Sequence, residues 1–428
     1  MINSVDIIGG GLAGSEAALY LASRGINVRL FEAKPNWRSA AHKSDSFAEV
    51  VCSNSFKSVL ETTASGALKN ELFLLGCRLL EIANEVSVPA GGALAVDREK
   101  FSARVTEEIN SNKNIEVIHK TVESFDTDRL TIVCAGPVCH DGLACYLSKL
   151  IGSDSLFFFD AAAPIITAES VDMTKAFFGA RYGKGGDDYL NCPMTKDEYL
   201  AFHSELISAE RVIDEVTKGD NRVFEGCMPV EVMAARGVDA LRFGPLRPVG
   251  FDKKHYAVLQ LRKENAEGSL FNLVGFQTNL KFGEQKRVFS MIPALKNMEI
   301  VRYGVMHRNT FIDAPKAIDP DLRLKNYPNV FVAGQLCGVE GYVESIAAGL
   351  IAAINAERLL KGKQTVTPPE NTIIGALLKY ISAPNANFQP MNANFGILPQ
   401  IGGKKADRKR AYYERSAAAM TDWIKTAL

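Results

Sequence analysis

A glycine-rich turn between an apolar strand and an apolar helix, close to the start of the chain, constrains the fold most. Residues 5–16 read VDIIGGGLAGSE, in which Gly9, Gly11 and Gly14 have the spacing G-x-G-x-x-G. In such a turn the first glycine makes the bend, the second gives the backbone room to approach a pyrophosphate, and the third lets helix and strand pack closely. The spacing therefore predicts a buried strand over residues 4–8 and a phosphate-binding turn directly after it.

The segment after the turn favours a dinucleotide site over an ordinary glycine turn. Residues 13–23 predict an apolar helix, and its N-terminus places Leu12 and Ala13 where a pyrophosphate would bind. A second strand over residues 27–31 ends at Glu32, about 20 residues after the turn, where an acidic side chain binds the adenosine ribose. Glycines also gather in plain turns, but a strand, turn, helix, strand and acid in this order indicate a dinucleotide-binding unit.

The length, charge and cysteine content of the chain limit the class of protein it can be. With 428 residues it is long for a single core, so we expect two domains or one domain with a large insertion. Lys+Arg and Asp+Glu both number 49, so a polyanionic partner has to be met by a local patch. No apolar run reaches the ~20 residues of a membrane span, and the chain enters its first strand too early for a signal peptide. The eight cysteines include no C-x-x-C pair, which favours reduced thiols in the cytoplasm and offers no metal-site spacing.

A second strand–loop–helix unit lies about 300 residues after the first. Residues 329–334 predict a buried strand, and residues 341–349 predict a helix rich in small side chains. Two such units so far apart indicate that both ends of the chain build one sheet around one long cofactor. FAD has the length to need both units, with its adenosine at the first and its flavin at the second, whereas a simple NAD domain finishes within about 150 residues.

We therefore predict an α/β fold with a Rossmann-like FAD-binding domain of the glutathione reductase type. This domain is discontinuous, over residues 1–180 and 299–428, and residues 181–298 form an inserted α+β domain. The pattern of apolar and turn-forming residues further predicts strands over 115–118, 130–137 and 256–261, and helices over 66–83, 99–109, 372–382 and 406–427.

Motifs along the whole chain resemble those of one family, the folate- and FAD-dependent tRNA (uracil-5-)-methyltransferases, TrmFO, formerly called Gid. The resemblance implies transfer of a one-carbon unit from 5,10-methylenetetrahydrofolate to carbon 5 of a uridine in the T-loop of tRNA. It also implies that reduced FAD carries the methylene and supplies the hydride, and that NADH or NADPH reduces the flavin. The matching motifs are GGGLAGSEAA (9–18), FAEVVCSNS (47–55), PAGGALAVDR (89–98), YLNCPMT (189–195), EGCMPVE (225–231), GFQT (275–278), RYGVMHRNT (302–310), GVEGYVES (338–345) and FQPM (388–391).

The chemistry implied by this resemblance needs thiols. Carbon 5 of uracil is a poor nucleophile until a thiolate adds to carbon 6, and a base must later remove the proton from carbon 5. The resemblance assigns these roles to Cys52 and Cys227; we predict Cys227 as the nucleophile and Cys52 as the base or as an adduct-protecting thiol. A free cysteine is otherwise most often a small buried hydrophobe. That is our prediction for Cys77, Cys134, Cys139, Cys145 and Cys337.

The resemblance also implies roles in cofactor binding. It places the ring of Tyr342 against the isoalloxazine and His307, with Asn309 in the same motif, over the folate pterin. A core aromatic and a structural histidine are the alternatives. Gly334 and Gln335 follow the late strand, where flavoproteins generally have Gly-Asp, and an amide still donates to a pyrophosphate or ribityl oxygen.

Short basic clusters are the candidates for RNA contact, although such clusters are more often solvated helix faces. A uridine must leave its stack to reach a flavin, so we expect base flipping. Three functions remain open: the methyltransferase, on tRNA or on ribosomal RNA; an FAD oxidoreductase of a small molecule; and a non-catalytic flavin-binding scaffold. The basic candidates are Lys281, Lys286, Arg287, Lys404, Lys405, Arg408, Lys409 and Arg410.

Overall fold

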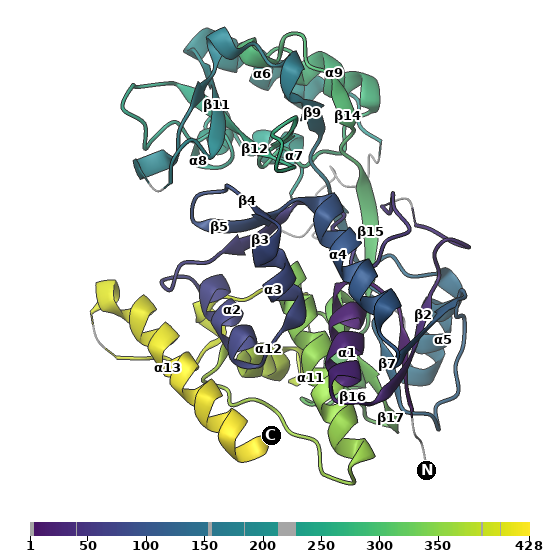
Figure 1. The fold of residues 1–428 in the computed structure, drawn as a ribbon. Coiled ribbons are helices and arrows are strands. Elements are labelled where there is room, and N and C mark those ends of the chain that lie inside the picture. Colours follow the sequence, from purple (N-terminus) through teal and green to yellow (C-terminus); the bar gives the residue numbers. More distant parts are fainter. Residues whose placement is uncertain are drawn as a thin grey trace.

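The computed structural model forms two lobes (Figure 1). It describes residues 4–39, 41–152, 156–183, 185–212, 228–386, 388–402 and 404–428, without the side chains of 156–160, 307, 308, 405 and 406. The lower lobe in Figure 1 carries both ends of the chain, and the upper lobe is built from its middle. This arrangement confirms the predicted α/β fold with an inserted α+β unit.

Both ends of the chain contribute strands to one sheet in the lower lobe, as predicted. Strand β7 lies between an N-terminal and a C-terminal strand: Val133 pairs with Ile8 on one side and with Val332 on the other, both in parallel register. Only the edge strand β16 runs antiparallel to its neighbour. The order is β16 (Arg323–Leu324), β17 (Tyr327–Val332), β7 (Thr131–Val133), β1 (Ser4–Ile8), β2 (Asn27–Glu32) and β6 (Ile115–His119).

Two apolar helices pack together on this sheet. Helix α1 (Leu12–Ser23) is buried along nearly its whole length because it lies between the sheet and α11 (Tyr342–Leu360). The two helices approach so closely that a Cβ atom on Gly349 would lie 2.2 Å from the carbonyl oxygen of Ala13. A glycine is therefore required at the crossing, which fixes the late helix against the helix of the glycine-rich turn.

The helix predicted over residues 66–83 is two helices in the structure. Leucines at helical spacing continue through the whole segment, but Gly76 has a φ of +74°, a left-handed conformation that ends the first helix. The adjoining helices are α2 (Ala64–Leu74) and α3 (Arg78–Glu85), with α4 (Arg98–Ser111) after them.

The other elements of the lower lobe surround this core. Helix α13 packs on α2, and α12 packs on both α2 and α11. Among the described residues no helix is long and apolar enough to cross a membrane. The elements are the sheet β3 (Ser55–Ser58), β5 (Ala93–Val96) and β4 (Ser87–Val88), with α5 (Asp141–Ile151), α10 (Ala314–Ala317), α12 (Ile373–Ser382) and α13 (Lys405–Ala427).

The upper lobe has its own sheet and its own apolar core. Its sheet also includes β9 and β10, which precede residue 181, and β14, which follows residue 298. The strand pairing therefore favours domain boundaries near residues 162 and 304. The division of the chain into two domains stays a prediction. Strands β8 (Leu156–Ala161) and β15 (Met306–Phe311) pair with each other at these two crossings. The sheet order is β10 (Phe177–Phe178), β11 (Tyr189–Met194), β12 (Ala257–Lys263), β13 (Leu270–Leu273), β9 (Ile165–Thr167) and β14 (Ile300–Arg302), with helices α6 (Lys196–Ser208), α7 (Val230–Ala234), α8 (Ala240–Phe243) and α9 (Phe282–Phe289).

Candidate functional site

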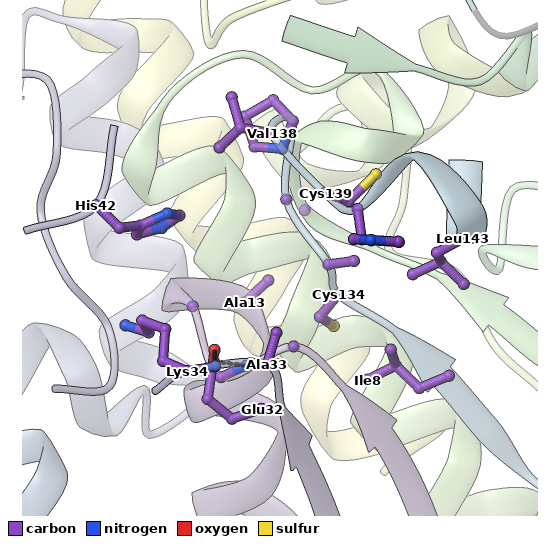
Figure 2. A pocket seen from close by; sticks show the side chains of 18 of the residues that line it. Ile8, Ala13, Glu32, Ala33, Lys34, His42, Cys134, Val138, Cys139 and Leu143 are labelled. Carbon is purple, nitrogen blue, oxygen red and sulfur yellow. Dashed lines mark hydrogen bonds between the residues drawn. The ribbon is translucent and has the colours of Figure 1, made fainter. Parts of the chain in front are cut away.

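A large cleft lies at the carboxyl ends of β1, β2, β7 and β17, the position at which open α/β sheets bind ligands. It contains about 1150 Å³ of empty space, part of it open to solvent. Figure 2 shows Glu32 and Lys34 on one side of the cleft, near Ala13, and Cys139 and Leu143 on another. The structure thus brings together many of the predicted cofactor residues: Gly9, Gly11, Leu12, Ala13, Glu32, Gly334, Gln335 and Tyr342 all line this cleft.

The three glycines of the turn have different surroundings. A Cβ atom on Gly9, at φ +103°, would lie 2.5 Å from the Cys134 carbonyl oxygen, and one on Gly14 would lie 1.9 Å from the Gly9 carbonyl oxygen. A Cβ atom on Gly11 would meet nothing within 4 Å. Gly9 and Gly14 are therefore needed for packing, whereas Gly11 leaves space in the cleft.

The start of α1 faces this space without a side-chain cap. The first backbone N–H groups of a helix have no partner within the helix, and together with the helix dipole they favour a negative charge. An uncapped helix N-terminus beside the open space at Gly11 fits a pyrophosphate.

Glu32 is held in place by the backbone. One carboxylate oxygen accepts a hydrogen bond from Gly10 N and the other from Lys34 N, each at 2.9 Å. The side chain is buried but lines the cleft, and each oxygen keeps a further lone pair. This geometry fits ribose hydroxyls, so the residues present match the adenosine and pyrophosphate parts of FAD.

Tyr342 connects the cleft to Cys52. Its hydroxyl oxygen accepts hydrogen bonds from Cys52 N at 2.7 Å and from Ser53 N at 3.0 Å. Burial, reinforced by Cys52, raises the pKa of Tyr342 well above its usual range, so the phenol stays protonated. The Sγ atom of Cys52 lies 3.7 Å from the carbonyl oxygen of Ala161, at the crossing between the lobes.

Three arginines hold the loop that carries Cys52. Arg98 donates to the carbonyl oxygens of Val50 and Cys52 at 2.7 and 3.3 Å. Arg302 donates to the carbonyl oxygen of Val51 at 2.7 Å. Arg262 donates to Asn54 Oδ1 at 2.8 Å and to Ser53 Oγ at 2.9 Å. Because Arg262 and Arg302 belong to the upper sheet, the upper lobe fixes the loop as much as the lower lobe does.

One carboxylate balances this arginine group. Glu264 is buried and accepts a hydrogen bond from Arg98 Nε at 2.5 Å. Burial opposes the charge of Arg98, but Glu264 outweighs it and raises the pKa of that guanidinium. Burial lowers the pKa of Arg262 and of Arg302.

Cys227 lies outside the described residues, as does the side chain of His307. The segment directly after Cys227 is anchored by Glu231, whose carboxylate accepts from Thr278 Oγ1 at 2.9 Å and from Asn279 N at 2.7 Å. Thr278 N in turn donates to the carbonyl oxygen of Ala162, next to the carbonyl that Cys52 contacts. Asn309 is buried in β15 and does not line the cleft.

The remaining cysteines are only partly as predicted. Cys77, Cys134 and Cys337 are buried, Cys139 is half-buried, and Cys145 is exposed on α5, so the prediction for Cys145 is wrong. Its helix presents this position to solvent, which the sequence pattern did not indicate. Among the residues the structure describes, no group of three or more metal-ligating side chains is arranged to hold a metal ion.

The predicted RNA-contacting residues form two different environments. Lys281 pairs with Glu210 at 2.7 Å, and Arg287 pairs with Glu284 at 2.8 Å and also with Glu205. Lys286 is half-buried on α9. Near the start of α13, Lys404, Arg408, Lys409 and Arg410 are exposed; Arg410 pairs with Glu414, and the Lys405 side chain is not described.

Comparison with known proteins identifies the family. A family model described as "Glucose inhibited division protein A" matches residues 4–364. The chain is 53% identical to methylenetetrahydrofolate--tRNA-(uracil-5-)-methyltransferase TrmFO of Acetivibrio thermocellus, covering 98% of each chain. It is 48% identical to the protein of the same name from Fusobacterium nucleatum, over 100% of this chain and 99% of that one. The chain belongs to the TrmFO family.

The structure of Aquifex aeolicus GidA has the same overall fold as this TrmFO-family chain, with a TM-score of 0.71. That likeness covers 98% of this chain and 73% of the GidA chain at 15% identity, so it speaks for the fold alone.

Sequence reasoning missed the arginine group that surrounds the Cys52 loop in this TrmFO-family chain. Arg98 lies in a motif that carried the resemblance, but no role was assigned to it. Arg262 follows the largely apolar run AVLQL in its strand, and this was the available indication, because a buried cation in a strand needs specific partners. Trp37 and His140 were missed as well: their rings meet edge-on at 5.3 Å and both line the cleft.

Proposed function

We propose that this protein is a methylenetetrahydrofolate--tRNA-(uracil-5-)-methyltransferase that uses FAD and oxidises NADH or NADPH. The observation that carries the proposal is the hydrogen bonding of Tyr342, a residue of the cofactor cleft, to the backbone of Cys52 and Ser53. A flavoprotein whose reaction uses no thiol has no need to tie a cysteine loop to the helix at its flavin. Near-full-length identity to TrmFO proteins supports the same activity.

The residues that line the cleft match the polar groups of FAD. Glu32 would bind the adenosine ribose, the start of α1 at Gly11, Leu12 and Ala13 would bind the pyrophosphate, and Gly334 and Gln335 would lie along the ribityl chain. Tyr342 would lie against the flavin ring. When bound and reduced, FAD supplies the one-carbon unit taken from methylenetetrahydrofolate and the hydride that completes the methyl group.

The thiols prepare the uracil. In our proposal the thiolate of Cys227 adds to carbon 6 of a T-loop uridine, and carbon 5 becomes nucleophilic enough to accept the one-carbon unit. Cys52 then takes the proton from carbon 5, and elimination of the Cys227 thiolate restores the ring. The anchoring of Glu231 through Thr278 to Ala162, beside the Cys52 contact at Ala161, supports convergence of the two cysteines. His307 and Asn309 are proposed for the folate side of the site.

The basic run at the start of α13 is proposed to contact RNA. Cations at a helix N-terminus oppose the helix dipole, so Lys404 and Arg408 do not stabilise this helix. Their exposure, with no ion pair to a described residue, leaves them available for phosphates. A protein that acts on tRNA is expected to work in the cytoplasm.

The test is a methylation assay with unmodified tRNA, methylenetetrahydrofolate and NADH, with a ribosomal RNA fragment as the second substrate. We expect 5-methyluridine in tRNA, none after Cys227→Ala or Cys52→Ala, and unchanged FAD content in both variants. Cys145→Ala is the matched control because this thiol is exposed on α5 outside the cleft. Normal turnover by Cys227→Ala would remove the proposed mechanism, and product in ribosomal RNA alone would reassign the substrate.

A further inference from the structure

A second built cluster lies on the upper lobe, outside the cleft. It is formed where the edge strand β10 and the turn after it meet the loop that precedes β12, beside β11 and α8 (Figure 1). None of its residues was assigned a role from the sequence. We call it the aromatic–arginine cluster, and its members are Phe177, Arg181, Tyr182, Arg247, Phe251 and His255.

The aromatic part consists of three rings in mutual contact, those of Phe177, Phe251 and His255. Phe177 and His255 are stacked, with centroids 5.3 Å apart and planes 20° apart. Phe251 meets Phe177 edge-on at 5.4 Å, and the guanidinium of Arg181 lies 5.5 Å from the Phe251 ring centre. Next to Phe177, the Phe178 side chain is 40% exposed on the edge strand.

The arginine part consists of Arg181 and Arg247, one on each of the two segments that meet here. Neither Arg181 nor Arg247 has a carboxylate within ion-pair distance among the residues that the structure describes. Burial, together with the neighbouring charge of Arg247, lowers the pKa of Arg181. Arg181 Nη2 donates to the carbonyl oxygen of Val258 at 3.4 Å, and the buried Nε atom has no hydrogen-bond partner among the described residues. A Cβ atom on Gly250 would lie 3.1 Å from Arg181 Cβ, so the loop that carries Arg247 lies against Arg181. Two guanidinium groups on facing segments fit an anion that bridges them.

Tyr182 is held in a strained backbone conformation while its ring faces solvent. Its φ of 60° and ψ of 24° are left-handed, and its side chain is 58% exposed. The strain is maintained by a hydrogen bond from Tyr182 N to the carbonyl oxygen of Gly250 at 2.8 Å. At φ +95°, Gly250 also has to lack a side chain, because a Cβ atom there would lie 3.1 Å from both the Tyr182 ring and Arg181. Backbone strain of this kind is concentrated at ligand-binding sites, and the exposed ring of Tyr182 leaves a face open to a ligand.

We propose that the aromatic–arginine cluster is a docking surface for RNA, with a phosphate between Arg181 and Arg247 and an unpaired base stacked on Tyr182. This proposal rests on the proposed function, since it names where the RNA substrate is held away from the reacting uridine. Guanidinium pairs bind phosphates, and exposed aromatic rings stack on bases of any sequence. Because the chain has no net charge, its affinity for RNA has to come from such local groups.

The positions of the lobes agree with this assignment. Lys253 and Lys254 are exposed on the same loop as Arg247, and the one carboxylate between them and Arg247 in the sequence is the exposed Asp252. In Figure 1 the start of α13 and the β11–α8 part of the upper lobe lie on the same side of the molecule, with β4 and β5 between them. One RNA that spans both lobes would therefore contact the cluster and the basic run of α13 together.

The test measures binding of the full-length FAD-bound protein to an unmodified tRNA transcript at several KCl concentrations. For the double variant Arg181→Gln/Arg247→Gln we expect about tenfold weaker binding and a salt dependence reduced by about one to two phosphate contacts. The KM for tRNA should rise with kcat unchanged. Arg24→Gln, an exposed arginine after α1 in the lower lobe, is the matched control and should bind as the unchanged protein does.

Tyr182→Gly separates binding from folding. Glycine accepts a positive φ without strain, so this variant should melt at the same temperature or higher, yet bind tRNA about tenfold more weakly with an unchanged salt dependence. Tyr182→Phe should keep the affinity because it keeps the ring.

Two outcomes would overturn the RNA-docking proposal. The first leaves the proposed function intact, and the second contradicts it as well. If the unchanged protein binds and methylates tRNA while both cluster variants match it in affinity and salt dependence, the cluster is not an RNA surface and the proposed function stands. If the unchanged protein neither binds nor methylates RNA, while it reduces its flavin with NADH, the proposed function fails as well.

Discussion

The hydroxyl of Tyr342 and the backbone N–H of Cys52 are 2.7 Å apart, although the two residues are separated by 290 positions in the chain. Tyr342 opens α11, and Cys52 lies on a loop that the upper lobe also holds through Arg262 and Arg302. The thiol is therefore positioned by the same helix that would carry the flavin.

Replacing Tyr342 with Phe should disturb this relationship without removing the ring. The N–H groups of Cys52 and Ser53 would lose their acceptor, so we expect a loss of about 1–3 kcal/mol in unfolding free energy. Methylation should fall at least about tenfold because the Cys52 thiol is no longer held in its position relative to the substrate. Urea unfolding and a methylation assay on protein with equal FAD content measure the two effects. Tyr380→Phe, which removes a hydroxyl bonded to Gln389 outside the cleft, should methylate normally.

Two glycine-to-alanine substitutions in the first turn should have different effects, one on FAD affinity and the other on stability. Gly11→Ala meets open space and has a negative φ, so the FAD-free protein should keep its stability and lose FAD affinity. Gly14→Ala drives a methyl group against the Gly9 carbonyl at 1.9 Å, so the FAD-free protein itself should be destabilised. Thermal unfolding of FAD-free protein and titration with FAD distinguish them. Equal stability of the two variants would contradict the assignment of Gly11 to the ligand and Gly14 to packing.

Local sequence patterns were sufficient for the first turn and for the joining of the chain ends. Glycine spacing, apolar strands and an acid at Glu32 depend on neighbours close in sequence, and the sheet order follows once β17 is recognised as a second strand of the same type. The break at Gly76 was missed because leucine periodicity does not register a single positive φ. The arginine group and the aromatic–arginine cluster were missed for another reason: Arg98 and Glu264, like Arg181 and Phe251, meet only after folding.

Glu264 should contribute to stability because it is the buried counter-ion of Arg98. Glu264→Gln keeps the shape of the side chain but leaves Arg98 buried without its counter-ion, which should lower the unfolding free energy by about 3 kcal/mol. The loop around Cys52 would loosen, so methylation should fall too. The nearby Glu267→Gln is the control: its pair with Lys100 is exposed, and its loss should not change stability measurably. Similar urea midpoints for the two variants would argue against a structural role for the buried pair.

The pH dependence of stability should report the lowered pKa of Lys69. This lysine is buried on α2, where Nζ donates to Ser58 O and Ser65 Oγ, both at 2.9 Å. Burial, with the charge of Lys57, lowers the pKa of Lys69 to about 7 from 10.5.

Between these two pH values the unfolded chain binds the proton on Lys69 and the folded chain does not. Stability should therefore rise with pH from about 7 to about 10.5, by up to ~1.4 kcal/mol per pH unit from this group. Lys69→Met should remove that slope, whereas Lys363→Met, at an exposed position, should retain it. Urea unfolding at pH 7, 8, 9 and 10 gives the slopes, and parallel curves for Lys69→Met and the unchanged protein would mean that Lys69 stays protonated in the folded state.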